Sequence, residues 1–466
     1  MKPAAETNGL KTACRILLLA LAFVAIFTRC DKEPEPEPQP ENVIRDVNFH
    51  EALLERGFDT NGDGMISSSE AAAVDYLDVS ACGITSFNGI EAFIHLLILD
   101  CHENRLTGLD VSGNTDLIEL NCSGNQVSAL DLSANTALTE LDCSDNNLTS
   151  LDISNSAALT VLDCSENQLT SLDVSGNPYL IRLDCGGNMI TSLDVRNSLP
   201  LTHLDCSENQ LSTLYISENT ALTVLVCSNN QLTGLDVSGN HDLVDLRVFD
   251  NQLSSLDVSN NPALEWLGCS SNPITSLDVS GLHDLQTLQC SVNQLESLDV
   301  SNNTALNYLQ CSRNALTTLD VSDHPGLNYL YCEHNRLTTL DISNDLALRR
   351  FECSENQLTT LDVSDKTNLY WLECGSNQLT TLDVSNLTGL QLLHCGNNLI
   401  TGLDISNTIL GQGGVASASW IDCYLDISNM PTLTDVCVWA IPFPPEGFKL
   451  CAGGSPNVNF TTECSK

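Results

Sequence analysis

The sequence predicts a solenoid, a right-handed coil whose turns each contribute one short strand to a parallel β-sheet on the concave face. A 21-residue unit, LxxLxCxxNxLTxLDVSxNxA, recurs fifteen times over residues 96–410 without insertion or deletion. Leucine at its first position and asparagine at its ninth are present in all fifteen units. A fixed period with unbroken columns is typical of stacked repeats that share one core.

Each part of the unit has an expected place in the turn. The segment around LxC is expected to form the strand, with Leu and Cys pointing into the coil and the residues between them facing out. A unit of this length leaves little room for a helix, so TxLDVS is expected to be a short extended or turn segment on the convex face. The asparagine is expected to bond backbone groups of neighbouring turns. The aspartate column from Asp110 to Asp404 is interpreted as capping turn amides, with a calcium ladder as the alternative.

Composition limits the functions open to the chain. Its 466 residues carry 60 Asp and Glu against 18 Lys and Arg, a formal net charge of -42. Such a polyanion is repelled by nucleic-acid phosphates and by anionic lipid surfaces, so neither is an expected partner. The Ser, His and Asp residues have a repeat explanation first, and no catalytic motif stands apart from the periodic background, so an enzyme is not expected.

Residues 1–30 have the features of a lipoprotein-type signal peptide. Basic residues precede an apolar run, Ile16 to Phe27, which is too short to span a bilayer, and Cys30 follows as the expected lipid-attachment residue. An ordinary cleaved export signal is the alternative, because Arg29 stands where a lipobox has a small residue. Residues 31–45 begin with DKEPEPEPQPE and are expected to form an extended acidic tether. The protein is thus expected to be exported and anchored at the outer membrane, on the cell surface, with the lipid as its membrane contact.

Residues 46–95 are predicted to form a small helical N-terminal cap that holds one calcium ion. The stretch DTNGDGMISSSE, residues 59–70, places oxygen ligands at the spacing of an EF-hand loop, with Gly64 at the sharp turn. Phe49, Leu53 and Leu54 form the apolar face of a helix before it. A single loop lacks the pairing of calcium sensors, so a structural role is expected. The predicted ligands are Asp59, Asn61, Asp63, Met65 through its carbonyl, Ser67 and Glu70.

Most of the 21 cysteines fall into two groups. Fourteen occupy the sixth position of the repeat, and the one remaining unit has Val248 there. Because valine can replace cysteine, the position is expected to need a small buried apolar group, and the fourteen cysteines are expected to be free thiols. Residues 411–466 are expected to form an irregular repeat and a C-terminal cap. Four cysteines there, Cys423, Cys437, Cys451 and Cys464, are disulfide candidates, and the pair expected to join is Cys437 with Cys464.

The outward columns of the predicted sheet change character along the chain. The first half carries an acidic strip that includes Asp142, Asp163, Asp184 and Asp205. The second half gathers large aromatics with arginine, which are usual anchors of protein interfaces and also suit stacking on sugar rings. Packing of these side chains against one another across strands is the purely structural alternative. The residues of this aromatic patch are Trp266, Tyr308, Tyr329, Tyr331, Arg350 and Trp371.

The order of these segments resembles a known family. Repeats such as LTELDCSDNNLTSLDISNSAA are similar to those of bacterial extracellular leucine-rich-repeat proteins, including the internalin-like type. The signal, the tether, the EF-hand or dockerin-like loop and the entry segment LDVSACGITSFNGIEAF resemble a group of exported bacterial lipoproteins. The resemblance implies a cell-surface scaffold that binds a protein ligand, in an adhesion or adaptor role. The alternative is a surface lipoprotein that captures glycans for a nutrient-uptake system.

Overall fold

The computed structural model describes residues 44–412 and 421–464, all within the compact unit Asn42–Lys466. The predicted signal peptide, Cys30 and nearly all of the predicted tether lie outside the described residues. In the described part of the chain, no helix is long and apolar enough to cross a membrane.

A small helical cap precedes the first turn of the coil, as predicted. Helix α2 (Val47–Glu55) has Asp46 as its N-cap, whose Oδ1 accepts a hydrogen bond from the Phe49 amide at 3.0 Å. The buried Phe49 ring meets the Phe87 ring edge to face. The second carboxylate oxygen of Asp46 accepts from Thr85 Oγ1 at 2.6 Å, so this residue both caps the helix and fastens it to the entry segment. The cap also contains helix α3 (Ser68–Ala71). The predicted cap 46–95 extends too far, because β1 (Tyr76–Asp78) already pairs with β2 (Ile98–Asp100) as the first strand of the coil, and the 3-10 helix η1 (Ile90–Ala92) lies in that turn.

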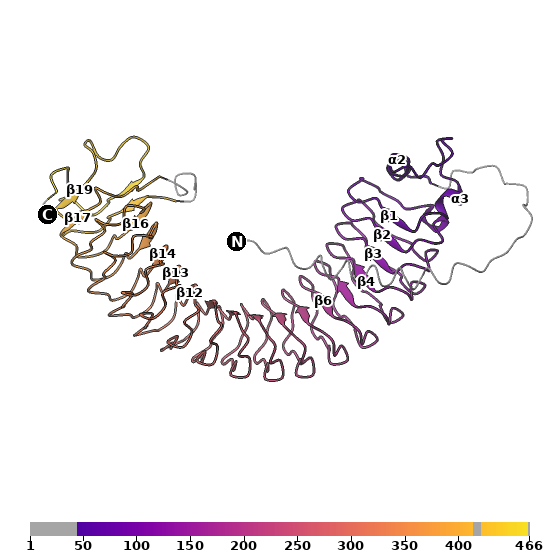
Figure 1. The fold of residues 1–466 in the computed structure, drawn as a ribbon, viewed down its shortest axis with the longest axis horizontal. Helices are drawn as coiled ribbons and strands as arrows, with labels where there is room; N and C mark the ends of the chain where they lie inside the picture. The colour runs from indigo at the N-terminus through magenta and orange to yellow at the C-terminus, as the bar shows by residue number, and fades with distance from the viewer. Residues whose placement is uncertain (1–43, 413–420, 465–466) are drawn as a thin grey trace, which may run out of the picture. The chain divides into compact units, whose positions relative to one another are not determined.

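Eighteen strands form one parallel sheet, in which neighbouring turns pair in register. Figure 1 shows these strands on the inner side of the stack of turns. After β16 the sheet continues through β18 and β20, so the C-terminal segment prolongs the coil. The strands are β1 (Tyr76–Asp78), β2 (Ile98–Asp100), β3 (Glu119–Asn121), β4 (Glu140–Asp142), β5 (Val161–Asp163), β6 (Arg182–Asp184), β7 (His203–Asp205), β8 (Val224–Val226), β9 (Asp245–Arg247), β10 (Trp266–Gly268), β11 (Thr287–Gln289), β12 (Tyr308–Gln310), β13 (Tyr329–Tyr331), β14 (Arg350–Glu352), β15 (Trp371–Glu373), β16 (Leu392–His394), β18 (Leu425–Asp426) and β20 (Leu450–Cys451).

The alternation of side chains along each strand builds the core. In β5 the central Leu162 is fully buried, while Val161 and Asp163 on either side are half-buried and face outward. The fourteen cysteines that follow the strands are buried free thiols, as predicted. Burial raises the pKa of these thiols, that of Cys227 to about 12, so they stay neutral and pack as small apolar groups.

The convex side of the turns is formed by short extended and turn segments, as predicted, with isolated bridges such as Leu109 to Leu130. At the C-terminal end these segments become a second, three-stranded parallel sheet. Its strands are β17 (Gly402–Asp404), β19 (Asp435–Cys437) and β21 (Asn459–Thr461).

The asparagine at the ninth position of the unit joins adjacent turns, which confirms its predicted role. Asn167 Nδ2 donates to the Cys143 carbonyl of the preceding turn at 3.0 Å and to the Cys164 carbonyl at 3.3 Å. Its Oδ1 accepts from the Leu148 amide at 2.9 Å. The same three bonds recur along the coil, so one side chain per turn satisfies backbone groups that would otherwise be buried without partners.

A second interior column contains an ionisable cluster that the sequence interpretation missed. In seven turns this position is an asparagine whose Nδ2 donates to two carbonyls of the preceding turn, as in Asn135. In three consecutive turns it is His324, Asp345 and Lys366, whose side chains are buried. Lys366 Nζ donates to the Ser343 carbonyl at 3.0 Å, whereas neither carboxylate oxygen of Asp345 has a hydrogen-bond partner. The sequence carries a signal for this cluster, because the middle residue of the segments DHP, NDL and DKT stands where the repeat usually has asparagine.

Candidate functional site

Five of the six residues of the predicted aromatic patch are half-buried on the outward face of the large sheet. Trp266 lies on β10, Tyr308 on β12, Tyr329 and Tyr331 on β13, and Arg350 on β14. Because β12, β13 and β14 pair in register, Tyr308, Tyr329 and Arg350 stand side by side across the sheet. The coil therefore places these residues, which lie up to four repeats apart in the sequence, on one surface.

The patch is held by contacts between its own members. The Tyr308 ring centroid lies 5.9 Å from that of Tyr329 and 5.3 Å from that of Tyr331. The Arg350 guanidinium lies 5.4 Å from the Tyr331 ring centroid and is bonded to Glu352 Oε1 at 2.6 Å. Cross-strand packing is thus real, and it leaves part of each ring open to solvent in a fixed position.

The expectation that Trp371 is exposed was wrong. Its side chain is only 4% exposed, because it packs with Ile421 and Tyr424 of the C-terminal segment. Arg350 covers its ring at 4.1 Å from the centroid, and its Nε1 donates to Glu373 Oε1 at 2.8 Å. Trp371 therefore fixes the C-terminal end of the patch, and its ring packs against the Arg350 guanidinium.

A second aromatic cluster at the other end of the patch was missed from the sequence. Phe249 packs edge to face against Trp266, with ring centroids 5.5 Å apart, and Arg247 lies 4.4 Å from the Trp266 centroid. A Cβ atom at Gly268 would overlap both rings, so glycine is required beside them. The sequence signal was present in this unit, where Val248 and Phe249 replace the usual Cys and Ser.

The electrostatics of the outward face differ between its two halves. In the acidic strip, Asp142, Asp163, Asp184 and Asp205 are register partners on adjacent strands. Burial and the neighbouring carboxylates Asp163 and Asp205 raise the pKa of Asp184 to about 6. In the patch, burial and the nearby Glu373 raise the pKa of Glu352 to about 7, although Arg350 opposes this shift. Both regions therefore change charge near neutral pH.

The loop predicted to bind calcium is a tight turn whose carboxylates accept hydrogen bonds from its own amides. Asp59 Oδ2 accepts from the Gly64 amide at 2.8 Å, and Gly64 has a φ of 79°, which favours glycine. Ser67 is the N-cap of α3 and forms a capping box with Glu70. Hydrogen bonds from Ser67 lower the pKa of Glu70 to about 2, so this carboxylate is ionised. The all-oxygen donor set of Asp59, Asn61, Asp63, the Met65 carbonyl, Ser67 and Glu70 fits a hard cation.

The convex aspartate column has the turn-capping role predicted for it. In the turns that carry the aspartate, which are all but the one with Tyr215, its Oδ1 accepts from the amide two residues later, as in Asp110 to Ser112 at 3.0 Å and Asp383 to Ser385 at 3.0 Å. These hydrogen bonds lower the pKa of Asp110 below its usual range. The column is accounted for by local backbone bonding.

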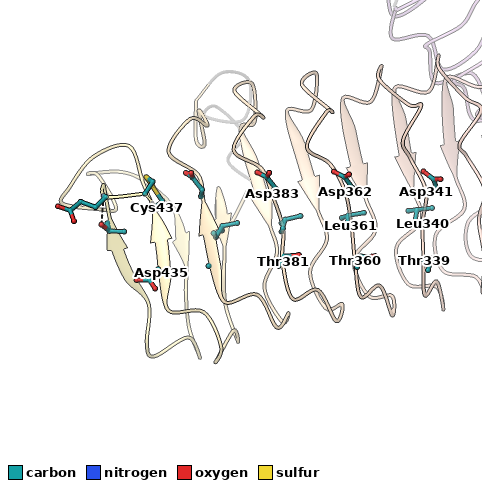
Figure 2. Close-up of a pocket in the computed structure, with 17 residues that line it drawn as sticks. Thr339, Leu340, Asp341, Thr360, Leu361, Asp362, Thr381, Asp383, Asp435 and Cys437 are labelled. Carbon is teal, nitrogen blue, oxygen red and sulfur yellow. Dashed lines mark hydrogen bonds between the residues drawn. A yellow bond between two sulfur atoms is a disulfide. The ribbon is translucent and has the colours of Figure 1, made fainter. Parts of the chain in front are cut away.

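The four C-terminal cysteines form two disulfides, Cys437 with Cys464, the pair expected from the sequence, and Cys423 with Cys451. The first lies beside the three-stranded sheet, at the end of a cavity drawn in Figure 2. Among the described residues one group of His, Cys, Asp or Glu side chains brings three ligand atoms within 4.8 Å of one another, and it consists of Asp404, Cys437 and Cys464.

Comparison with known proteins identifies the repeat. A family model for Leucine Rich repeats (2 copies) matches residues 136–179. The functional domain of InlJ from Listeria monocytogenes, described as including a cysteine ladder, is 35% identical with a TM-score of 0.66, over 82% of this chain and 80% of that domain. A leucine-rich-repeat protein of Leptospira interrogans is 28% identical with a TM-score of 0.65, over 72% of this chain and 92% of its own. No curated protein sequence matches the chain.

A more distant match shows the fold alone. It is the ectodomain of the plant receptor kinase GASSHO1/SCHENGEN3 from Arabidopsis thaliana, in complex with CASPARIAN STRIP INTEGRITY FACTOR 2. It is 20% identical with a TM-score of 0.58, over 75% of this chain and 51% of that one. With the InlJ match, the parallel coil and its asparagine and cysteine columns, the chain belongs to the leucine-rich-repeat family, and internalin-like proteins are among its structural neighbours.

Proposed function

We propose that the chain is a cell-surface binding scaffold that holds a protein ligand on its concave sheet, in an adhesion or adaptor role. The observation that carries this proposal is the aromatic patch, where Trp266, Tyr308, Tyr329, Tyr331 and Arg350 are fixed by mutual contacts while remaining half-exposed. Rigid aromatic and arginine anchors lose little conformational entropy on binding, which favours them as the energetic centre of an interface. The Arabidopsis receptor supports the proposal by analogy of fold, since it was solved with its ligand. No enzymatic role is proposed.

The test uses the full chain as bait for surface proteins, with matched variants. Tyr308→Ala with Tyr331→Ala should remove a captured partner, because the two rings form the centre of the patch. Tyr179→Ala with Tyr215→Ala is the control, since these tyrosines are 63% and 62% exposed and lie outside the patch. Circular dichroism checks that both variants fold. Equal capture by the two variants would contradict the proposal.

Glycan capture is the second candidate, and one observation favours it. Between the two aromatic clusters, Gln289 Nε2 donates to Gln310 Oε1 at 3.2 Å, and Tyr308 Oη donates to the same oxygen at 3.2 Å. Amide groups beside aromatic rings suit sugar hydroxyls and ring faces. A glycan array probed with the same variants separates the candidates, because a glycan ligand would bind without any protein and would be lost with Tyr308.

A structural calcium ion in the loop 59–70 belongs to the same proposal. The ion would be held by Asp59, Asn61, Asp63, Ser67, Glu70 and the Met65 carbonyl, and it would brace the cap. Millimolar calcium should raise the unfolding temperature of the chain, and Glu70→Gln should abolish this rise, whereas Glu55→Gln on the exposed side of α2 should leave it unchanged. An unfolding temperature that ignores both calcium and chelator would contradict the proposal.

Export and lipid anchoring at Cys30 complete the proposed function. The support is the sequence pattern of the first thirty residues. In the bacterial host, Cys30→Ser should move the protein from the membrane fraction to the soluble fraction and remove acyl-chain labelling. Labelling that persists in this variant would contradict anchoring at Cys30.

A further inference from the structure

The C-terminal end of the coil has a cavity of about 970 Å³ that the proposed function does not use. Three successive turns line it with one threonine, one leucine and one aspartate each, in rows that lead to the three-stranded sheet (Figure 2). The next turn contributes Gly402, Leu403 and Asp404. Cys437, Glu463 and Cys464 line its C-terminal end. The cavity therefore combines solvent access with two sulfur atoms and a concentration of carboxylates.

The three-stranded sheet brings Asp404, Cys437 and Cys464 together from distant parts of the chain. Asp404 at the end of β17 is the register partner of Cys437 at the end of β19, and Cys437 is in turn the partner of Thr461 on β21. Cys464 lies three residues after the end of β21 and is bonded to the Cys437 side chain. The ligand atoms of the three residues all lie within 4.8 Å of one another.

We propose that this cluster is a redox-controlled zinc site, closed by the Cys437–Cys464 disulfide and opened by its reduction. Two equivalents of a small thiol reductant, of the glutathione class, reduce the disulfide to two thiols and are themselves oxidised to one disulfide. A Zn²⁺ ion then displaces the two thiol protons and binds two thiolates and the Asp404 carboxylate. In the reverse exchange, the disulfide form of the same small thiol oxidises the two thiolates back to the Cys437–Cys464 disulfide, is itself reduced to two thiols, and the ion is released.

The geometry suits this ion. Zinc bound tetrahedrally to sulfur and oxygen places neighbouring ligand atoms about 3.5 to 3.8 Å apart. Once the disulfide opens, the two sulfurs must separate to this distance, and the Asp404 carboxylate already lies within 4.8 Å of both. The Ser406 amide donates to Asp404 Oδ1 at 2.9 Å, which orients the carboxylate as second-shell hydrogen bonds commonly do. The fourth position is left for water or for Glu463, which lines the same cavity.

The other cysteines of the described chain lack these features. The fourteen column thiols are buried with raised pKa values, one per turn. The half-buried free Cys82 and the Cys423–Cys451 disulfide belong to no such ligand group. Zinc binding through thiolates is therefore expected at one site, and it can be distinguished from cation binding at the oxygen-lined loop 59–70 by the ligand type.

Cobalt(II) is the probe, because thiolate ligation gives it an intense charge-transfer absorption that oxygen ligation does not. The full chain reduced under mild conditions should develop this band with one equivalent of cobalt, zinc should displace it, and the oxidised chain should show none. The band should persist in the double variant Cys423→Ser, Cys451→Ser and be lost in Cys437→Ser.

Asp404→Asn tests the carboxylate, with Asp383→Asn as the matched control one turn earlier in the same column and cavity. Asp404→Asn should weaken cobalt binding at least about tenfold, and Asp383→Asn should not. The absence of the band in the reduced chain, or its survival in Cys437→Ser, would overturn the site. Equal affinities of the two aspartate variants would overturn the role of Asp404. If circular dichroism shows that Cys437→Ser is misfolded, the test depends on two other measurements. These are the cobalt band of the reduced unmodified chain and the cobalt affinities of Asp404→Asn and Asp383→Asn.

Discussion

Asp345 places a carboxyl group inside the coil, at a position where seven turns have asparagine. Burial raises its pKa to about 7, while the positive charge of Lys366 opposes the shift and Asp341 and Asp320 add to it. His324 lies one turn before it in the same column and Lys366 one turn after. In the unfolded chain the same carboxyl titrates near its ordinary pKa of about 4.

The sign of the pH dependence follows from this difference. A raised pKa in the folded state means that the folded chain binds a proton that the unfolded chain has already lost. The stabilisation is complete below about pH 4 and disappears as the pH rises through about 7. Asp345→Asn supplies the amide of the other turns and should raise the free energy of unfolding at pH 8 by about 1 to 4 kcal/mol. Denaturant titrations at pH 6 and 8 test this, with exposed Asp242→Asn as the charge-matched control; equal shifts in both variants would contradict it.

The ladder asparagines should be costly to remove. Asn167→Ala leaves the Leu148 amide and two carbonyls without partners inside the coil, and should lower the free energy of unfolding by about 3 kcal/mol. Gln168→Ala changes the exposed neighbour and should cost less than about 0.5 kcal/mol. Urea denaturation of the two variants side by side provides the measurement, and similar midpoints would refute the proposed role of the ladder.

At the scale of the element, the cysteine column behaves as part of the core. Its thiols are buried and their pKa values are raised by burial, so the reactive thiolate form is suppressed. The valine at position 248 is also fully buried, which shows that the column selects a small apolar group.

Thiol labelling should reveal this burial directly. Of the free cysteines in the described chain, Cys82 is half-buried, and the fourteen of the column are buried. A thiol reagent added to the native protein at pH 8 should label Cys82 alone among these fifteen, and all fifteen should react in denaturant. Mass spectrometry of the labelled peptides tests this, and rapid native labelling of Cys227 or Cys290 would be incompatible with the packing described.

At the scale of the whole molecule, the periodic features could be predicted from the sequence and the exceptions could not. The coil, the sheet register and the asparagine ladder follow from a 21-residue period, because each repeat packs against neighbouring repeats of the same pattern. The buried Trp371 was mispredicted because Ile421 and Tyr424, which cover it, belong to a segment outside the repeat. Phe249 was missed because it follows the cysteine column and lies outside the two outward strand columns that carry the other aromatics. The buried Asp345 was missed because the unit pattern shows a consensus asparagine there.

Stability in a coil of this kind is a sum over neighbouring turns, so damage should remain local. Replacing Cys423 and Cys451 with serine loosens β18 and β20, which pair beyond β16. Amide exchange should therefore accelerate near Leu393 and remain unchanged near Leu162. Hydrogen exchange followed by mass spectrometry would show this, whereas acceleration along the whole coil would indicate a single cooperative unit.

The central claim is that the concave aromatic patch holds the ligand, and cross-linking from within the patch tests it most directly. A photo-reactive amino acid at Thr287, on the outward face of β11 between the two aromatic clusters, should form a covalent adduct with the partner on the cell surface. The same group at exposed Ser297, on the convex side of the same turn, should form none. An adduct from Ser297 and none from Thr287 would place the ligand on the other face and contradict the account.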